Sequence, residues 1–156
     1  MAMLDGDEKN RILMELVQSE WTAYARGEDF DKQSTPQRVF SSVWALEAEV
    51  NNGGLSQYFF NSSRFTAPFV IEALVTIGAH RAADLSRRAI QCAFPDGLPG
   101  DLNAMRLAAA NFPDAVEETL NKLDREFYQY PDDLTGLLFD YVRTHPEEFG
   151  DLTDFS

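Results

Sequence analysis

The sequence predicts an all-α fold, a compact single-domain bundle of about seven helices. Apolar side chains recur every three or four residues along most of the chain, as they do on the buried face of a helix. Three prolines, Pro36, Pro68 and Pro113, stand where such stripes begin, and proline is common in the first turn of helices. No stretch shows the convincing alternation of a strand. We therefore expect one domain over residues 1–156, which is an ordinary domain length.

Three helices are predicted in the first half of the chain. The first spans residues 7–26. Its apolar face is formed by Leu13, Leu16, Val17, Trp21 and Tyr24. The second begins after Thr35, which we interpret as its N-cap, and ends in the segment 51–54. The third begins near Pro68 and ends at Gly78, because glycine readily adopts the left-handed backbone that terminates helices.

The second half predicts four further helices, separated by loops. A helix over 80–93 carries apolar residues on one side and arginines on the other. The sequence FPDGLPGD, residues 94–101, has the two prolines and two glycines of a loop. A short alanine-rich helix follows at 102–110. The most regular apolar stripe lies between Pro113 and Pro131, and a last helix runs from Leu134 to a point before Pro146.

The net charge is −13, and it is concentrated at the two ends of the sequence. Residues 1–31 carry eight acidic and three basic side chains, a net charge of −5. Residues 32–113 carry six acidic and seven basic side chains, a net charge of +1, and residues 114–156 carry twelve and three, a net charge of −9. Phosphate repels such a surface, so we expect no direct binding to nucleic acid or to anionic membranes. A basic protein is the complementary partner, although negative charge can also serve solubility alone.

The residues needed for catalysis or metal binding are not arranged in a recognisable pattern. Helical di-iron proteins use Glu-x-x-His pairs, and neither His80 nor His145 has glutamate three positions earlier. Ser56 lies in GLSQY, which lacks the second glycine and the preceding strand of a nucleophile elbow. Cys92, the only cysteine, has apolar neighbours that favour an inert thiol. We predict no enzymatic activity, no metal and no cofactor.

Cellular location is predicted from the same features. One cysteine permits no disulfide within the chain, which suits a reducing compartment. The N-terminal residues are polar and acidic, and the most apolar stretch, FVIEALVTIGA, is short and contains Glu72. We therefore expect a cytoplasmic protein without a membrane span.

The segment EVNNGGLSQYFFNSS, residues 49–63, has two interpretations. Asparagine and glycine tolerate unusual backbone angles, so residues 51–54 suit a corner between two helices, with Tyr58 and Phe59 buried and polar neighbours bonding free backbone groups. Aromatic and amide side chains also suit the wall of a ligand pocket. The residues of this corner or pocket are Asn51, Asn52, Gly53, Gly54, Gln57, Tyr58 and Asn61.

This segment also carries a family resemblance. NNGGLSQYFFNSS, followed by ALVTIGAHRAADL and AFP, resembles the bacterial family built on domain of unknown function 4375, which includes DNA mimic protein nineteen. The resemblance covers about residues 36–130 and implies an all-helical fold. It also implies a dimer with an acidic surface that imitates DNA and captures a transcription repressor. The motif marks the fold, and it does not by itself identify which carboxylates would act.

The acidic part, residues 114–156, supplies the candidate partner-binding face. Its carboxylates avoid the apolar stripes, so we expect them to point to solvent. They are Asp114, Glu117, Glu118, Asp124, Asp132, Asp133, Asp140, Glu147 and Glu148, with Asp151 and Asp154 extending the series. Lys122 and Arg125 interrupt this row, which departs from a continuous track of phosphates.

Three hypotheses for function follow. The first is a non-enzymatic acidic protein that binds a basic surface, such as that of a DNA-binding regulator, as a DNA mimic and with a homodimer as one expected state. The second is an immunity-like inhibitor of a basic nuclease or toxin, which would use the same charges. The third is a small-molecule enzyme or binder that uses a polar-aromatic pocket around residues 51–61.

Overall fold

Helices make up 77% of the residues that the structure, a computed structural model, describes, namely 4–19 and 30–150. This part of the chain contains no strand, so the predicted all-α class is confirmed. Its elements are α1 (Gly6–Val17), α3 (Thr35–Phe60), the 3-10 turn η1 (Ser62–Thr66), α4 (Ala67–Thr76), α5 (His80–Ala93), α6 (Leu102–Ala110), α7 (Asp114–Phe127), α8 (Leu134–Arg143) and α9 (Pro146–Phe149). The predicted helices at 80–93 and 102–110 are confirmed at both ends.

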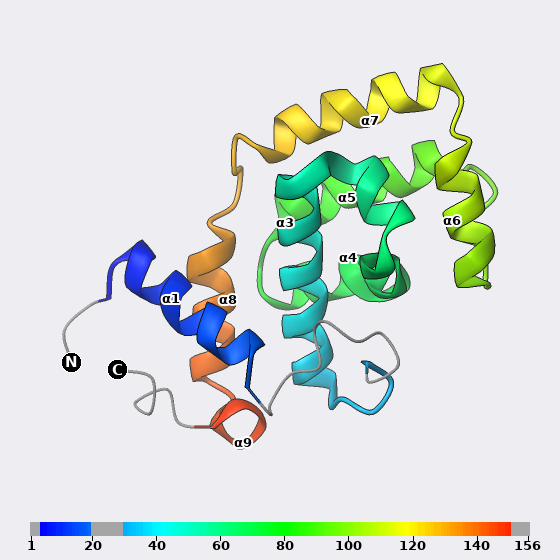
Figure 1. Ribbon diagram of the computed structural model, residues 1–156. Coiled ribbons are helices and arrows are strands. Elements are labelled where there is room, and N and C mark those ends of the chain that lie inside the picture. The colour runs from blue at the N-terminus through cyan, green and yellow to red at the C-terminus, as the bar shows by residue number, and fades with distance from the viewer. Residues whose placement is uncertain (1–3, 20–29, 151–156) are drawn as a thin grey trace.

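The longest helix, α3, is the centre around which the others pack. It contacts α4, α6, α7 and α8, and α7 lies across one end of it (Figure 1). The start of α3 is set by Ser34, whose hydroxyl accepts a hydrogen bond from the N–H of Gln37 while the Gln37 side chain accepts one from the N–H of Ser34. This reciprocal pair is a capping box. The prediction that Thr35 is the cap was therefore wrong by one residue.

A kink at Gly54 divides α3 into two stretches. Gly54 has φ 85° and ψ 179°, a combination that only glycine adopts readily, whereas Asn51, Asn52 and Gly53 continue the first stretch as helix. The second stretch runs from Leu55 to Phe60. The predicted corner is thus confirmed, but the change of direction occurs at one residue and not over residues 51–54.

The remaining boundaries show where the sequence pattern was too coarse. Gly78 has φ 87°, which confirms the left-handed residue predicted after α4. The helix α1 ends at Val17 and not at residue 26, and the predicted apolar residues Trp21 and Tyr24 lie outside the described ranges. A short helix, α9, follows α8 after Pro146 and was not predicted.

The helices share one cluster of buried apolar side chains, to which α1 and α3 to α9 all contribute. Its largest members are aromatic, and they include Phe40, Tyr58, Phe59 and Phe149. The N-terminal α1 packs against α8, near the other end of the chain (Figure 1). Among the described helices, none is both long and apolar enough to cross a membrane.

Candidate functional site

Side chains of α7 hold the kink of α3 in place. The kink leaves the N–H of Leu55 without a partner in its own helix, and the Asp124 Oδ1 atom accepts its hydrogen bond at 2.8 Å. One residue further on, the Ser56 hydroxyl donates to Glu117 Oε2 at 2.7 Å. The prediction that Asp124 and Glu117 point freely to solvent was therefore wrong. Both carboxylates are half-buried and bind the family motif.

The environment of Asp124 disfavours its charge. Burial raises the pKa of this carboxyl above its ordinary value of 3.8, and the nearby Glu117 charge raises it further. The hydrogen bond from Leu55 and the charge of Arg125 act in the opposite direction. The acceptor that caps the second stretch of α3 is thus also a titratable group.

The polar residues after the kink bind a second carboxylate. Gln57 Nε2 and Asn61 Nδ2 donate to the same Glu49 oxygen, at 2.9 and 3.2 Å. We had expected these amides to bond free backbone groups, and that detail was wrong. Glu49 itself was not among the predicted site residues, although it begins the quoted segment.

Tyr58 is part of the core. Its side chain and that of Phe59 are both 1% exposed, which confirms the predicted burial. The Tyr58 hydroxyl lies 2.6 Å from Thr66 Oγ1. A ligand arriving from solvent therefore cannot reach the aromatic ring on which the pocket hypothesis depends.

A second polar cluster joins the first stretch of α3 to the segment after α7. Asn51 Nδ2 donates to the Tyr130 hydroxyl at 2.8 Å, and that hydroxyl donates to Glu47 Oε1 at 3.2 Å. Burial raises the pKa of Glu47, the Tyr130 hydroxyl lowers it, and the charge of Asp133 raises it again. Tyr130 has φ 49°, an uncommon conformation for a residue other than glycine. Sequence reasoning missed Glu47 and Tyr130, because only the fold brings them together.

Several carboxylates of the predicted acidic face cap helices or pair locally. Asp132 Oδ2 accepts from the N–H of Ala82 at 2.8 Å and so caps α5. Asp133 Oδ1 accepts from the N–H of Gly136 at 3.1 Å, as the N-cap of α8. Asp140 forms an ion pair with Arg143 at 3.0 Å. The positions of these three carboxylates are set by contacts within the fold.

Other predicted carboxylates are free to meet a partner. Asp114, Glu118 and Glu147 are exposed, and none of them forms an ion pair within residues 4–19 and 30–150. Glu148 is half-buried in α9. The predicted extension to Asp151 and Asp154 lies outside the described residues.

The two acidic ends of the sequence meet in space. The α1 helix, from the acidic N-terminal part of the chain, packs against α8 of the acidic C-terminal part, while α7 lies across α3 and α5 (Figure 1). The α1 carboxylates are Asp7, Glu8 and Glu15, with Asp5 as the N-cap. The acidic surface therefore has an α7 part and an α1–α8–α9 part, and sequence reasoning missed the contribution of α1.

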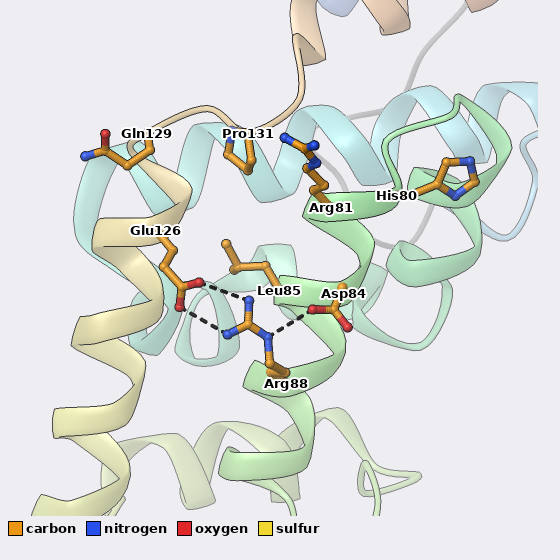
Figure 2. A pocket seen from close by; sticks show the side chains of 8 residues that line it. All are labelled: His80, Arg81, Asp84, Leu85, Arg88, Glu126, Gln129 and Pro131. Atoms are coloured by element: carbon orange, nitrogen blue, oxygen red, sulfur yellow. Dashed lines mark hydrogen bonds and ion pairs between the residues drawn. The ribbon is translucent and has the colours of Figure 1, made fainter.

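A groove of about 570 Å³ lies between α5 and α7. Figure 2 shows Arg88 between Glu126 and Asp84, with two contacts of 3.1 Å to Glu126 and one of 3.1 Å to Asp84. The rest of the lining is His80, Arg81, Leu85, Gln129 and Pro131. The ion pair between Arg88 of α5 and Glu126 of α7 ties these two helices together across the groove. Within the described ranges, no three His, Cys, Asp or Glu side chains gather closely enough to hold a metal ion.

Comparison with known proteins places this chain in a family. A protein-family model described as DMP19-like protein matches residues 31–145. The chain belongs to the DMP19-like protein family. The match includes α3 to α8 and therefore the kink with its α7 partners, whereas α1 and α9 lie outside it.

The other comparisons add no relative. Neither a curated protein nor a solved structure matches the chain. The resemblance to proteins like DNA mimic protein nineteen is confirmed, while the label of domain of unknown function 4375 stays a prediction.

Proposed function

We propose that this protein is a non-enzymatic DNA mimic that binds the basic DNA-binding surface of another protein. The observation that carries the proposal is the set of exposed carboxylates that form no ion pair within the described residues, Asp114 and Glu118 on α7 and Glu147 on α9. Membership of the DMP19-like family supports the proposal, because the name of the family is consistent with a DNA-mimic role. The net charge of −13 favours a basic partner over nucleic acid.

Rigid presentation makes these charges suitable for mimicry. B-DNA displays one negative charge per about 1.7 Å of its axis, at positions fixed by the double helix. Here the carboxylates project from helices whose inner faces belong to one core, and the start of α8 is capped by Asp133. Because these carboxylates are already held in place, little conformational entropy is lost when a basic surface binds them, and this favours binding.

Three matched double variants test the proposal. Two of them neutralise the surface: Asp114→Asn with Glu118→Gln on α7, and Asp140→Asn with Glu147→Gln on α8 and α9. The control, Glu72→Gln with Asp96→Asn, removes the same two charge types from exposed positions in the near-neutral middle of the chain. Glu117 and Asp132 are left unchanged, because they hold the fold together.

The proposal predicts a specific pattern of capture from a native cell extract. Wild type and the control should retain a basic DNA-binding partner at low salt, and the two surface variants should retain less. Capture should fall steeply as salt increases, since exposed charges are screened beyond about 8–10 Å at ordinary ionic strength. Equal capture by all four proteins at low and high salt would contradict the proposal. Capture of a basic nuclease or toxin would instead favour the immunity-like inhibitor.

A further inference from the structure

A groove between α1 and α3 has the chemistry of a binding site for a cationic side chain. Asn10 and Met14 line it from α1. The α3 side is formed by residues at helical spacings of three, one and three, namely Trp44, Glu47, Ala48 and Asn51. Its volume is about 230 Å³, below the roughly 300–1,000 Å³ typical of small-molecule pockets. A groove of this size suits one side chain better than a whole ligand.

The polar atoms that remain free in this groove are acceptors. Glu47 receives one hydrogen bond, from Tyr130, and within the described parts of the chain no basic side chain pairs with it. The amide nitrogen of Asn51 is bound to the Tyr130 hydroxyl, and that of Asn10 contacts the Met14 sulfur at 3.7 Å. No side chain or backbone N–H of the described residues donates to the amide oxygen of either asparagine, so both oxygens can accept. A carboxylate and two carbonyl oxygens require a donor-rich partner.

The apolar part of the groove suits a flat cation. Trp44 is held by stacking on Phe40, with ring centroids 6.0 Å apart and planes at 16°. Met14 is 50% exposed, a high value for an apolar side chain. An indole attracts cations through the negative face of its ring, and arginine makes such contacts more often than lysine.

We propose that this groove binds an arginine side chain of the basic partner, whose guanidinium donates to Glu47 and packs against Trp44 and Met14. The inference rests on the proposed function, which supplies a basic partner, and it identifies an anchor point within the acidic surface. Guanidinium carries five N–H donors and no acceptor, which complements the free oxygens of Glu47, Asn10 and Asn51. Burial and the Asp133 charge raise the pKa of Glu47, which means that they disfavour its charged form. A cation that binds in the groove would favour that charged form.

Nuclear magnetic resonance titration with short peptides tests the groove without the partner. The probe is the tripeptide Gly-Arg-Gly amide, and the control ligand replaces arginine with citrulline, which has a similar shape and no charge. We expect the arginine peptide to shift the signals of Asn10, Met14, Trp44 and Asn51, and the citrulline peptide to leave them nearly unchanged. Shifts confined to other acidic helices would overturn the assignment of this groove.

Two variants make the result specific. Glu47→Gln should weaken the arginine peptide about ten-fold or more, because hydrogen bonds to charged groups are roughly twice as strong as neutral ones. Glu118→Gln removes the same charge from α7 and should change the affinity less than about two-fold. Equal affinity of Glu47→Gln and Glu118→Gln would overturn the proposal.

Met14→Lys keeps the test valid if Glu47→Gln alters the local fold. The substitution is at a half-exposed position, and the new ammonium group can fill the groove from within and pair with Glu47. We expect this variant to stay folded by circular dichroism and to lose the groove signals of the arginine peptide. Wild-type peptide binding by Met14→Lys would contradict the proposal. A negative result with Glu47→Gln or with Met14→Lys would contradict only the arginine site. The DNA-mimic proposal is tested separately by the charge variants of α7, α8 and α9.

Discussion

The Asp124 carboxylate on α7 accepts a hydrogen bond at 2.8 Å from the N–H of Leu55, the first residue after the kink of α3. Many helices begin with a residue whose side-chain oxygen accepts a hydrogen bond from an N–H of the first turn. Here Gly54 occupies that place and has no side chain, so Asp124, 69 residues beyond Leu55 in the sequence, provides the acceptor. The family motif and α7 therefore depend on each other for their conformation.

Replacing Gly54 should destabilise the fold, whereas replacing Gly53 should not. Gly54→Ala adds a Cβ atom where φ is 85° and where it would clash with Asp124 Oδ2, so we expect a loss of about 1–3 kcal/mol in the free energy of unfolding. Gly53 is helical, and the three atoms nearest to its added Cβ all belong to the Gln57 side chain, whose flexible end can turn aside at the expense of its hydrogen bond to Glu49. Gly53→Ala should stay within about 1 kcal/mol of wild type in urea unfolding, because alanine favours helix. Equal losses for the two variants would contradict the role assigned to Gly54.

The sequence pattern alone predicts a corner within residues 51–54. Asparagine and glycine composition locates a corner, but it does not say which of four residues has the positive φ. Which residue has the positive φ depends on the contacts between α3 and the helices packed against it, and the local sequence does not contain that information.

Removing the carboxylate of Asp124 should distinguish its acceptor role from its charge. Asp124→Ala deletes the cap and should lower the free energy of unfolding by about 1–2 kcal/mol. Asp124→Asn keeps an oxygen that can accept from Leu55 and removes the repulsion with Glu117, so at neutral pH it should be clearly more stable than Asp124→Ala. Urea unfolding of the two variants measures the difference, and equal stability would contradict the cap.

The pH dependence of wild type relative to Asp124→Asn has a definite sign. The folded state raises the pKa of Asp124 above 3.8, so it retains a proton that the unfolded chain has already lost. This contribution stabilises the fold fully below pH 3.8 and is lost as the pH rises through the raised value. The stability of wild type minus that of Asp124→Asn should therefore fall with increasing pH. A difference that grows with pH would indicate a lowered pKa.

The variant Tyr58→Phe tests whether Tyr58 stabilises the core or binds a ligand. The hydroxyl is buried against Thr66, whose own hydroxyl donates to the Ser63 carbonyl oxygen at 2.8 Å. Losing this internal hydrogen bond should lower the free energy of unfolding by about 1 kcal/mol. Partner capture should be unchanged when the variant is measured below its melting temperature. Wild-type stability with loss of a bound small molecule would restore the pocket hypothesis.

Tyr130→Phe should raise the pKa of Glu47. The Tyr130 hydroxyl is the hydrogen-bond donor that favours the charged form of this carboxyl, and burial and Asp133 both oppose that form. Carbon-13 resonance titration of the Glu47 carboxyl measures the change directly. Tyr128→Phe is the matched control, since its hydroxyl donates to the Val50 carbonyl oxygen and not to Glu47. A Glu47 pKa that falls or stays constant in Tyr130→Phe would contradict this arrangement.

Local patterns in the sequence were sufficient for most of the fold. Apolar spacing and proline positions gave the bounds of α5 and α6, and Gly78 was recognisable as the end of α4 because its role depends on its own backbone. The short α9 has too few residues to show a period. The candidate site was harder to predict, because long-range contacts determine it. Periodicity placed Asp124 on the polar side of its helix, but it could not show that the kink of α3 meets that side.

The same limit applies to the acidic surface. Composition showed that both ends of the sequence are acidic, yet the packing of α1 against α8 is needed to join them. Conversely, counting carboxylates overstated the free charge, because Asp132 and Asp133 act as helix caps. Charge in a sequence gives the sign of a surface, whereas hydrogen bonding decides which groups remain free for a partner.

Competition with DNA tests the central claim most directly. A captured basic partner is saturated with fluorescently labelled duplex DNA, and each protein is added while the anisotropy of the DNA is followed. A DNA mimic should displace the duplex, so the anisotropy should fall with wild type and with the control Glu72→Gln, Asp96→Asn. The anisotropy should fall less with each of the two surface double variants, namely Asp114→Asn with Glu118→Gln and Asp140→Asn with Glu147→Gln. Unchanged or increased anisotropy with wild type, or equal displacement by all four proteins, would contradict the claim that these carboxylates take the place of DNA.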